Sequence, residues 1–398
     1  MSNGENSTPS GPPFGPSPFP APPDSSAPTI RAALDGPLDG PLDTKVDDHE
    51  IVVPQIVEAR QVAAAQAPQA HLSVTDVIER IPGRMRAVRA ELKKAIVGQE
   101  DNVQALLYAL LARGHCLLVG VPGLAKTMLV QALARVLNLS FKRIQFTPDL
   151  MPADITGTTI LQRDGGGERE FQFVRGPIFT QLLLADEINR TPPKTQAALL
   201  EAMQEKTVTV AGQTLPLEEP FFVLATQNPI EQEGTYPLPE AQLDRFLFEL
   251  HVGYPTLEEE RLIVAQHSFT PLQQLTTILE RHEILLFRDA VSHIPAPPNV
   301  IDYAVRLTRA TRPADPASIP ELRKLIRWGA SPRASQNMLL AARARAACEG
   351  RFNVACEDIV AVAPLILRHR VLRSFHAEAE GRSIDDIVAT IVRTIPRN

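Results

Sequence analysis

Short apolar runs alternate with amphipathic stretches through the middle of the chain. The runs that predict buried strands span residues 115–119, 141–146, 182–185, 221–225 and 246–250. Stretches with helical spacing lie between them, such as 126–137. Strands that alternate with helices predict an α/β fold, in which a parallel sheet is covered by helices on both faces.

Two hairpin-like patterns interrupt this alternation. The first spans residues 158–174, with Gly165-Gly166-Gly167 at its tip. The second pairs residues 207–210 with 215–217 across Gly212. We interpret both as inserts in the α/β part.

The pattern changes beyond residue 255. Helical spacing recurs in residues 256–267, 281–292, 299–310, 319–328, 333–348 and 356–372. We therefore predict an α/β domain over 72–254 and an all-helical domain over 255–398. Within the second domain, Trp328 is expected to pack inside, and Arg368-His369-Arg370 to form a solvated helix face.

The N-terminal segment has a different composition. Residues 1–44 contain eleven of the 36 prolines and few large apolar side chains. Such a segment cannot bury enough surface to offset the entropy of ordering, so we predict a disordered, proline-rich acidic tail over 1–71. It would act as a flexible spacer or, alternatively, as a proline-rich docking ligand. For residues 45–71 the alternative is part of a helix.

Charge and cysteine usage narrow the function classes. Residues 1–71 carry nine acids and three bases, which leaves 37 acids and 37 bases for the rest of the 398-residue chain. This balance makes nucleic acid an unlikely partner, because phosphate backbones select basic surfaces. The three cysteines form no CxxC pair, and no signal peptide or membrane span is readable, so we expect a cytoplasmic protein without membrane insertion.

The strongest chemical signal is Gly120-Val121-Pro122-Gly123-Leu124-Ala125-Lys126-Thr127, which follows a predicted strand and opens a predicted helix. This is the context of a phosphate-binding P-loop. Lys126 would reach the β and γ phosphates of a nucleotide, and Thr127 would ligate Mg²⁺. Ala125 stands where the general pattern has glycine, and we expect it to keep a negative φ. The alternative is a tight turn without a ligand.

Polar residues also end two other predicted strands. Asp186-Glu187 ends one of them, where Asp186 suits a Mg²⁺ ligand and Glu187 a base that polarises water. Asn228 ends another and would orient that water, although an Asn-Pro turn is the alternative. We expect Lys126, Thr127 and Asp186 to converge on one cavity.

Several longer motifs carry a family resemblance. They are Gln145-Phe146-Thr147-Pro148-Asp149-Leu150, Leu184-Ala185-Asp186-Glu187-Ile188-Asn189-Arg190, Ala225-Thr226-Gln227-Asn228-Pro229-Ile230-Glu231, Leu238-Pro239-Glu240-Ala241-Gln242-Leu243-Asp244-Arg245-Phe246 and Gly329-Ala330-Ser331-Pro332-Arg333-Ala334. Together with the P-loop, they resemble the MoxR group of AAA+ ATPases over roughly residues 80–398. That group usually carries alanine before the P-loop lysine, as here.

The resemblance implies an ATP- and Mg²⁺-dependent ATPase whose C-terminal domain is a helical lid. Arg245 falls on the arginine finger, which completes a neighbouring subunit's site, and Arg333 on the lid's sensor arginine. Gln99 lies where the family contacts adenine. The alternative for either arginine is a plain salt bridge, for example between Arg245 and Asp244 or Glu240.

The resemblance also implies partners. A finger that acts on a neighbour requires a homo-oligomer, expected to be a hexameric ring. The function implied is chaperone-like remodelling or maturation of a client protein, with a von Willebrand factor A domain protein as a possible partner. The alternatives are a chelatase-type or DNA-acting motor and a nucleotide-gated assembly scaffold.

Overall fold

The computed structural model describes residues 73–163, 169–231, 233–265 and 271–397. The predicted tail and the glycine tip of the first insert lie outside the described residues.

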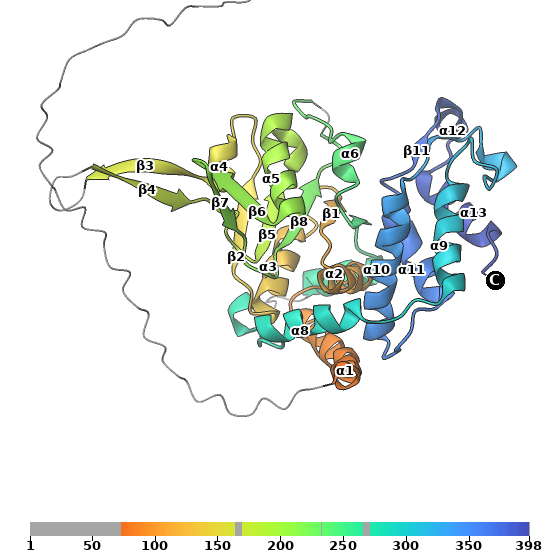
Figure 1. The fold of residues 1–398 in the computed structure, drawn as a ribbon, viewed down its shortest axis with the longest axis horizontal. Helices are drawn as coiled ribbons and strands as arrows, with labels where there is room; N and C mark the ends of the chain where they lie inside the picture. The colour runs from red at the N-terminus through yellow and green to blue at the C-terminus, as the bar shows by residue number, and fades with distance from the viewer. Residues whose placement is uncertain (1–72, 164–168, 232, 266–270, 398) are drawn as a thin grey trace, which may run out of the picture. The chain divides into compact units, whose positions relative to one another are not determined.

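A five-stranded parallel sheet forms the centre of the α/β part (Figure 1). Its order is β2 (Phe141–Gln145), β5 (Leu182–Asp186), β8 (Phe222–Gln227), β1 (Cys116–Val119) and β9 (Phe248–His251). Every neighbouring pair runs parallel, which confirms the predicted α/β class. Because the strands are parallel, the carboxyl ends of β1, β5 and β8 meet at one edge of the sheet.

Each strand feeds two hydrophobic cores, one on each face of the sheet. In β5, Leu182 and Leu184 belong to one cluster, whereas Leu183 and Ala185 belong to the other. This follows from the two-residue period of a strand, and burial on both faces explains why the strands appear as continuous apolar runs.

Helices surround the sheet in this part of the chain. They are α1 (Val74–Leu92), α2 (Glu100–Leu111), α3 (Lys126–Val136), α4 (Pro152–Thr156), the 3₁₀ turn η1 (Ile188–Arg190), α5 (Pro193–Glu205) and α6 (Glu240–Leu243). In the chain, α5 and η1 come directly after β5 and the acidic pair Asp186-Glu187.

Both predicted hairpins are present. β3 (Gly157–Arg163) pairs antiparallel with β4 (Arg169–Arg175), and β6 (Thr207–Val210) with β7 (Gln213–Pro216). The β3–β4 hairpin extends away from the central sheet (Figure 1). These segments are therefore inserts that add no strand to the central sheet.

Helices make up most of the C-terminal part. They are α7 (Leu257–Ala265), η2 (Leu272–Gln274), α8 (Arg281–Ser292), α9 (Pro298–Ala310), η3 (Pro320–Leu322), α10 (Pro332–Cys348), α11 (Cys356–Leu367), α12 (Phe375–Ala379) and α13 (Ile384–Thr394). Among the described helices, none combines the length and apolar character that a bilayer crossing needs.

Two expectations for this part need correction. Residues 319–328 form η3 and a short strand, β10 (Ile326–Trp328), which pairs with β11 (Leu372–Arg373). The domain is therefore helical with one small strand pair. Trp328 is 70% exposed rather than packed, because the pairing register shifts between Ile326 and Trp328 and only Ile326 turns inward.

The hydrophobic core continues across residue 255. One cluster combines buried side chains of α1, α2 and α3 with others from α8 to α11 and α13. Arg84 of α1 and Glu283 of α8 add an ion pair with 2.7 Å between Nη2 and Oε2. A division of the chain at residue 255 therefore stays a prediction.

Candidate nucleotide site

The P-loop segment connects β1 to α3, as its context predicts. Gly120 has to be glycine, because a Cβ there would lie 2.5 Å from the carbonyl oxygen of Val252. At Gly123, with φ +84°, a Cβ would meet no atom within 4 Å, so the loop is open on that side. No side chain caps the N-terminus of α3. Its free N–H groups and positive dipole end therefore face the loop, which suits an anion such as phosphate.

The conformation of Ala125 differs from our expectation. Its φ is +54°, in the left-handed region, so the predicted negative φ is wrong. The chain turns at this residue into α3, and an L-residue in that region costs about 1 kcal/mol relative to glycine. Gln99 and Glu187, both at φ +57°, share this strain. Such backbone strain is often found at functional sites.

Lys126 is electrostatically coupled to the two acids. Its Nζ donates a hydrogen bond to the carbonyl oxygen of Gly120. Burial lowers the pKa of Lys126, while the charges of Asp186 and Glu187 act in the opposite direction. The structure therefore brings the P-loop lysine and the acidic pair together.

Thr226 of β8 ties the acidic pair together. Its hydroxyl donates to Asp186 Oδ1 at 2.6 Å and accepts from the backbone N–H of Glu187 at 2.8 Å. The Thr226 side chain is buried. Because one hydroxyl satisfies both residues, it fixes the end of β5 relative to β8.

Strand β2 supplies further partners to the acids. Arg143 Nη2 lies 2.7 Å from Asp186 Oδ2, and Gln145 Nε2 lies 2.7 Å from Glu187 Oε2. Arg190 also donates to Glu187 Oε2, at 3.1 Å. Our sequence analysis assigned no role to these three residues or to Thr226. Gln145, Arg190 and Thr226 all stand in the motifs that carry the resemblance, which was the available signal.

Asn228 adopts the turn that we considered as the alternative. It is buried, and its Oδ1 accepts a hydrogen bond from the backbone N–H of Ile230 at 3.2 Å. The side-chain oxygen is thus used locally. A role for Asn228 in orienting water stays a prediction that would rest on the amide nitrogen.

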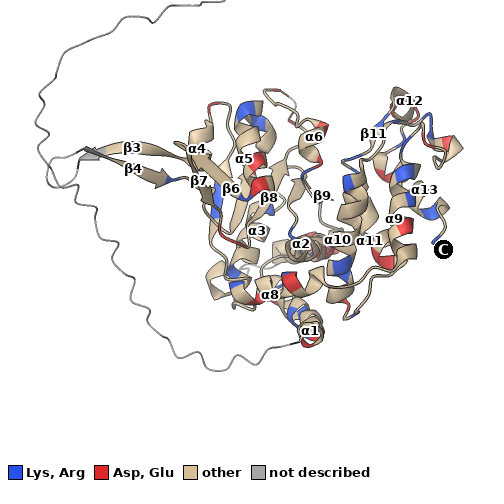
Figure 2. Ribbon diagram, in the orientation of Figure 1, with Lys and Arg blue, Asp and Glu red and all other residues tan. Residues whose placement is uncertain are grey.

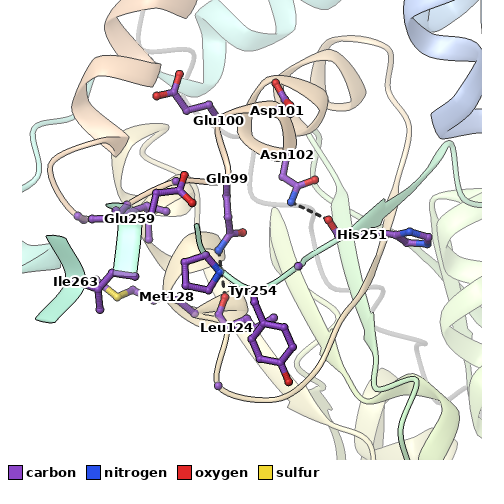
Figure 3. A pocket seen from close by; sticks show the side chains of 18 residues that line it. Gln99, Glu100, Asp101, Asn102, Leu124, Met128, His251, Tyr254, Glu259 and Ile263 are labelled. Carbon is purple, nitrogen blue, oxygen red and sulfur yellow. Dashed lines mark hydrogen bonds between the residues drawn. The ribbon is translucent and has the colours of Figure 1, made fainter. Parts of the chain in front are cut away.

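A cavity of about 550 Å³ lies beside the P-loop (Figure 3). Gln99 Nε2 donates to the carbonyl oxygen of Leu124 at 3.2 Å, which joins the Gln99 segment to the loop. Gln99 Oε1 is buried without a hydrogen-bond partner among the described residues. Apolar and aromatic side chains also line the cavity, among them Met128, Tyr254 and Ile263. The volume and the unpaired acceptor suit a base that offers an amino group.

The convergence of Lys126, Thr127 and Asp186 on one cavity stays a prediction. Lys126, Thr127 and Asp186 are not part of this cavity's lining, which ends at Ala125 on the P-loop side. The lining suits the base and sugar of a nucleotide, which would leave the P-loop and the start of α3 for its phosphates.

The oxygen donors at the phosphate end fit Mg²⁺. Thr127 offers a hydroxyl and Asp186 a carboxylate, both hard ligands. The described residues contain no group of three or more His, Cys, Asp or Glu that could hold a metal alone. Mg²⁺ commonly takes one or two protein ligands and completes its shell with water and phosphate oxygens.

Arg245 follows α6 and Arg333 lies in the first turn of α10. Asp244 does not pair with Arg245. Its carboxylate instead lies 3.4 Å from Arg333 Nη1 and 2.6 Å from Arg370 Nε. Within the described parts of the chain, the Arg245 side chain makes no ion pair, which counts against the salt-bridge alternative. The ion pair of Arg333 is with Asp244 and not with a P-loop residue.

The basic run at the end of α11 is not a solvated face. His369 and Arg370 are 6% and 7% exposed, so our expectation is wrong. The run lies where α11 contacts β9 and the loop before it, and the carbonyl groups there need donors. Burial and the charge of Arg370 hold the pKa of His369 well below its usual value.

Comparison with family models defines the class of protein. The model described as "ATPase family associated with various cellular activities (AAA)" matches residues 115–248, and the "AAA lid domain" model matches residues 322–391. The fold and the site therefore belong to an ATPase of the AAA class.

Curated relatives narrow this class. "Chaperone MoxR1" of Mycobacterium tuberculosis is 45% identical over 77% of this chain and 80% of the relative. "Protein MoxR" of Methylorubrum extorquens is 33% identical over 77% and 93%. A crystal structure of a candidate ATPase from Cytophaga hutchinsonii has a TM-score of 0.74 and 42% identity, and covers 81% of this chain and 97% of that one. The chain belongs to the MoxR family of AAA+ ATPases.

A DNA-acting relative matches less well. The Holliday junction branch migration subunit RuvB of Paracoccus denitrificans is 28% identical over 46% of this chain. The matches therefore favour a MoxR-type, chaperone-like ATPase over the chelatase-type and DNA-acting alternatives.

Proposed function

We propose that the protein hydrolyses ATP to ADP and phosphate and uses the reaction to remodel or mature a client protein complex. The observation that carries this proposal is the acidic pair Asp186-Glu187, held by Thr226 and electrostatically coupled to Lys126. A carboxylate fixed beside a phosphate-binding lysine is the arrangement that phosphoryl transfer to water requires.

The residues at the phosphate end divide the work. Residues 120–127 cradle the phosphates through backbone N–H groups, and Lys126 compensates their charge. Thr127 and Asp186 would hold Mg²⁺, which when bound neutralises charge on the β and γ phosphates. Glu187 takes the proton of the attacking water, and Gln145 and Arg190 hold its carboxylate in place.

Three other residues act around this centre. Gln99 receives the base in the cavity of Figure 3. Arg333 senses the γ phosphate of its own site, and Arg245 stabilises developing charge in a neighbouring subunit's site.

The proposal includes a homo-oligomer, expected to be a hexamer, and a protein client with a von Willebrand factor A domain protein as partner. Arg245 supports it, because its unpaired guanidinium is available to a second copy. Acidic and basic positions are interspersed over both parts of the chain (Figure 2), which suits protein more than nucleic acid. The three free cysteines suit a cytoplasmic protein.

ATP hydrolysis and binding should be measured for the wild type, Lys126→Ala and Glu187→Gln. We expect both variants to lose about 10³-fold in kcat or more, since each removes a group that acts on the reacting phosphate or water. Glu187→Gln should still bind ATP, whereas Lys126→Ala should bind it weakly. Lys194→Ala, at an exposed position of α5, is the control and should keep full activity.

Equal rates in all the variants would show that the proposed hydrolysis is wrong. Tight ATP binding by the wild type without any turnover would instead favour the nucleotide-gated scaffold.

A further inference from the structure

Arg370, which follows α11, is buried against the segment that carries Arg245. Only 2% of its side chain is exposed. Its Nε donates to Asp244 Oδ1 at 2.6 Å, and its Nη2 donates to the carbonyl oxygens of Asp244 at 2.9 Å and Phe246 at 2.5 Å. Its Nη1 also donates to the carbonyl oxygen of Leu247, at 3.3 Å. One guanidinium thus binds the chain on both sides of Arg245.

This contact leaves Arg245 with a fixed backbone and a free head. Asp244 and Phe246, its two neighbours in sequence, are both held by Arg370. The Arg245 side chain makes no ion pair with any described residue. A group that must meet a phosphate on another molecule gains from such pre-organisation, because displacements of about 1 Å can cost 10²-fold in rate.

The carboxylate of Asp244 also contacts residues at the start of α10. Asp244 Oδ2 lies 3.4 Å from Arg333 Nη1 and 3.3 Å from Ser331 Oγ, whereas Oδ1 is bound by Arg370. A cavity of about 230 Å³ opens at this junction. Arg333 can therefore leave Asp244 without disturbing the contacts that Arg370 makes.

We propose that Arg370 is a positioning residue for Arg245: it clasps the backbone on both sides of Arg245 and so aims that arginine at the ATP of a neighbouring subunit. Arg370 then serves the neighbour's site and not its own. This inference rests on the proposed function, in which Arg245 acts on a second copy of the chain.

The experiment compares Arg370→Gln alone with a mixture of Arg370→Gln and Glu187→Gln subunits of the full chain. Alone, we expect kcat to fall about 10- to 100-fold, as for other supporting residues, with the Kd for ATP unchanged within about twofold. In the mixture, each Glu187→Gln subunit presents a properly held Arg245 to the intact site of an Arg370→Gln neighbour. The rate per Arg370→Gln subunit should therefore rise.

A purely structural role, or a role in its own site, predicts no such rise. The reference is a mixture of Arg245→Ala and Glu187→Gln. If the reference recovers activity and the Arg370→Gln mixture does not, the positioning role is wrong and the proposed function stands. If the reference does not recover either, Arg245 does not act on a neighbour, and that part of the proposed function falls together with this inference.

Two further variants separate positioning from general loss of structure. Arg370→Lys keeps the charge and one contact to Asp244, so it should fold, show an intermediate kcat and recover in the same mixture. Arg368→Gln removes the adjacent arginine, which binds Asp385 and the carbonyl oxygen of Glu249 but not the Arg245 segment. We expect it to stay within about twofold of wild type. A loss equal to that of Arg370→Gln would show that docking of α11 in general, and not Arg370, is responsible.

Discussion

The phosphate end of the site (residues 120–127 with Asp186 and Glu187) and the arginine corner (Arg245 on its segment, held by Arg370) are built in different ways. At the phosphate end, the side chains of Asp186 and Glu187 are 12% and 23% exposed and are held by polar partners, and the edge of the sheet brings them to the P-loop. At the corner, the buried Arg370 donates hydrogen bonds to backbone carbonyl groups of a segment that lies 123 to 126 residues earlier in the chain. The first region depends on strand order, whereas the second depends on how the C-terminal helices pack. Mutations at the phosphate end should therefore affect the site of the same subunit, whereas mutations at the corner should affect the site of a neighbouring subunit.

Acid gives the largest expected effect, because the molecule contains two buried neutral histidines, one directly before β1, at the sheet edge opposite the phosphate end, and one at the arginine corner. His115 of the sheet accepts from the N–H of Val223 at 3.0 Å and lies 3.2 Å from the carbonyl oxygen of Met203, and burial lowers its pKa to about 4. The pKa of His369 at the corner is also far below normal. The unfolded chain takes up these protons near pH 6.5, so the free energy of unfolding should fall as the pH drops below that value.

For His115 this loss is about 2 kcal/mol between pH 7 and pH 5, and His369 should lower the stability further in the same direction. Urea unfolding at the two pH values measures it. His115→Gln and His369→Gln should each remove part of the pH dependence. If neither variant changes the slope, the buried histidines are not its source.

The two regions also differ in how much of them could be predicted from the sequence. The five strands and the positions of Lys126, Asp186 and Glu187 follow from local patterns, because parallel strands end at one edge whatever their order. Thr226 and Arg143 required the order β2-β5-β8, which no local pattern contains. Arg370 required the packing of α11 on a distant loop, and its charge alone favoured the wrong, solvated interpretation.

Thr226→Val should lower kcat by about 10- to 100-fold, because the isosteric change removes the hydroxyl that serves both Asp186 and Glu187. Steady-state ATPase assays measure this effect, and Thr226→Ser should keep most of the activity. The comparison with Arg370 is sharpest in mixtures. Thr226→Val damages its own site, so adding Glu187→Gln subunits should recover nothing. A recovery would mean that Thr226 acts across subunits and that the two regions do not differ in reach.

Ala125→Gly should give the smallest effect, a gain in stability of about 0.5 kcal/mol. Glycine relieves the left-handed strain of about 1 kcal/mol, and the greater freedom of the unfolded chain offsets part of that gain. Ala211, with φ +50° in the turn before Gly212, is the matched control. Ala211→Gly should gain a similar amount without any effect on ATP binding, because that turn lies in the β6–β7 hairpin and outside the site. The urea midpoints of the two variants measure the gains. If Ala211→Gly is stabilised and Ala125→Gly is not, the P-loop conformation is held by more than its own backbone preference, and the phosphate end would be as dependent on distant packing as the arginine corner.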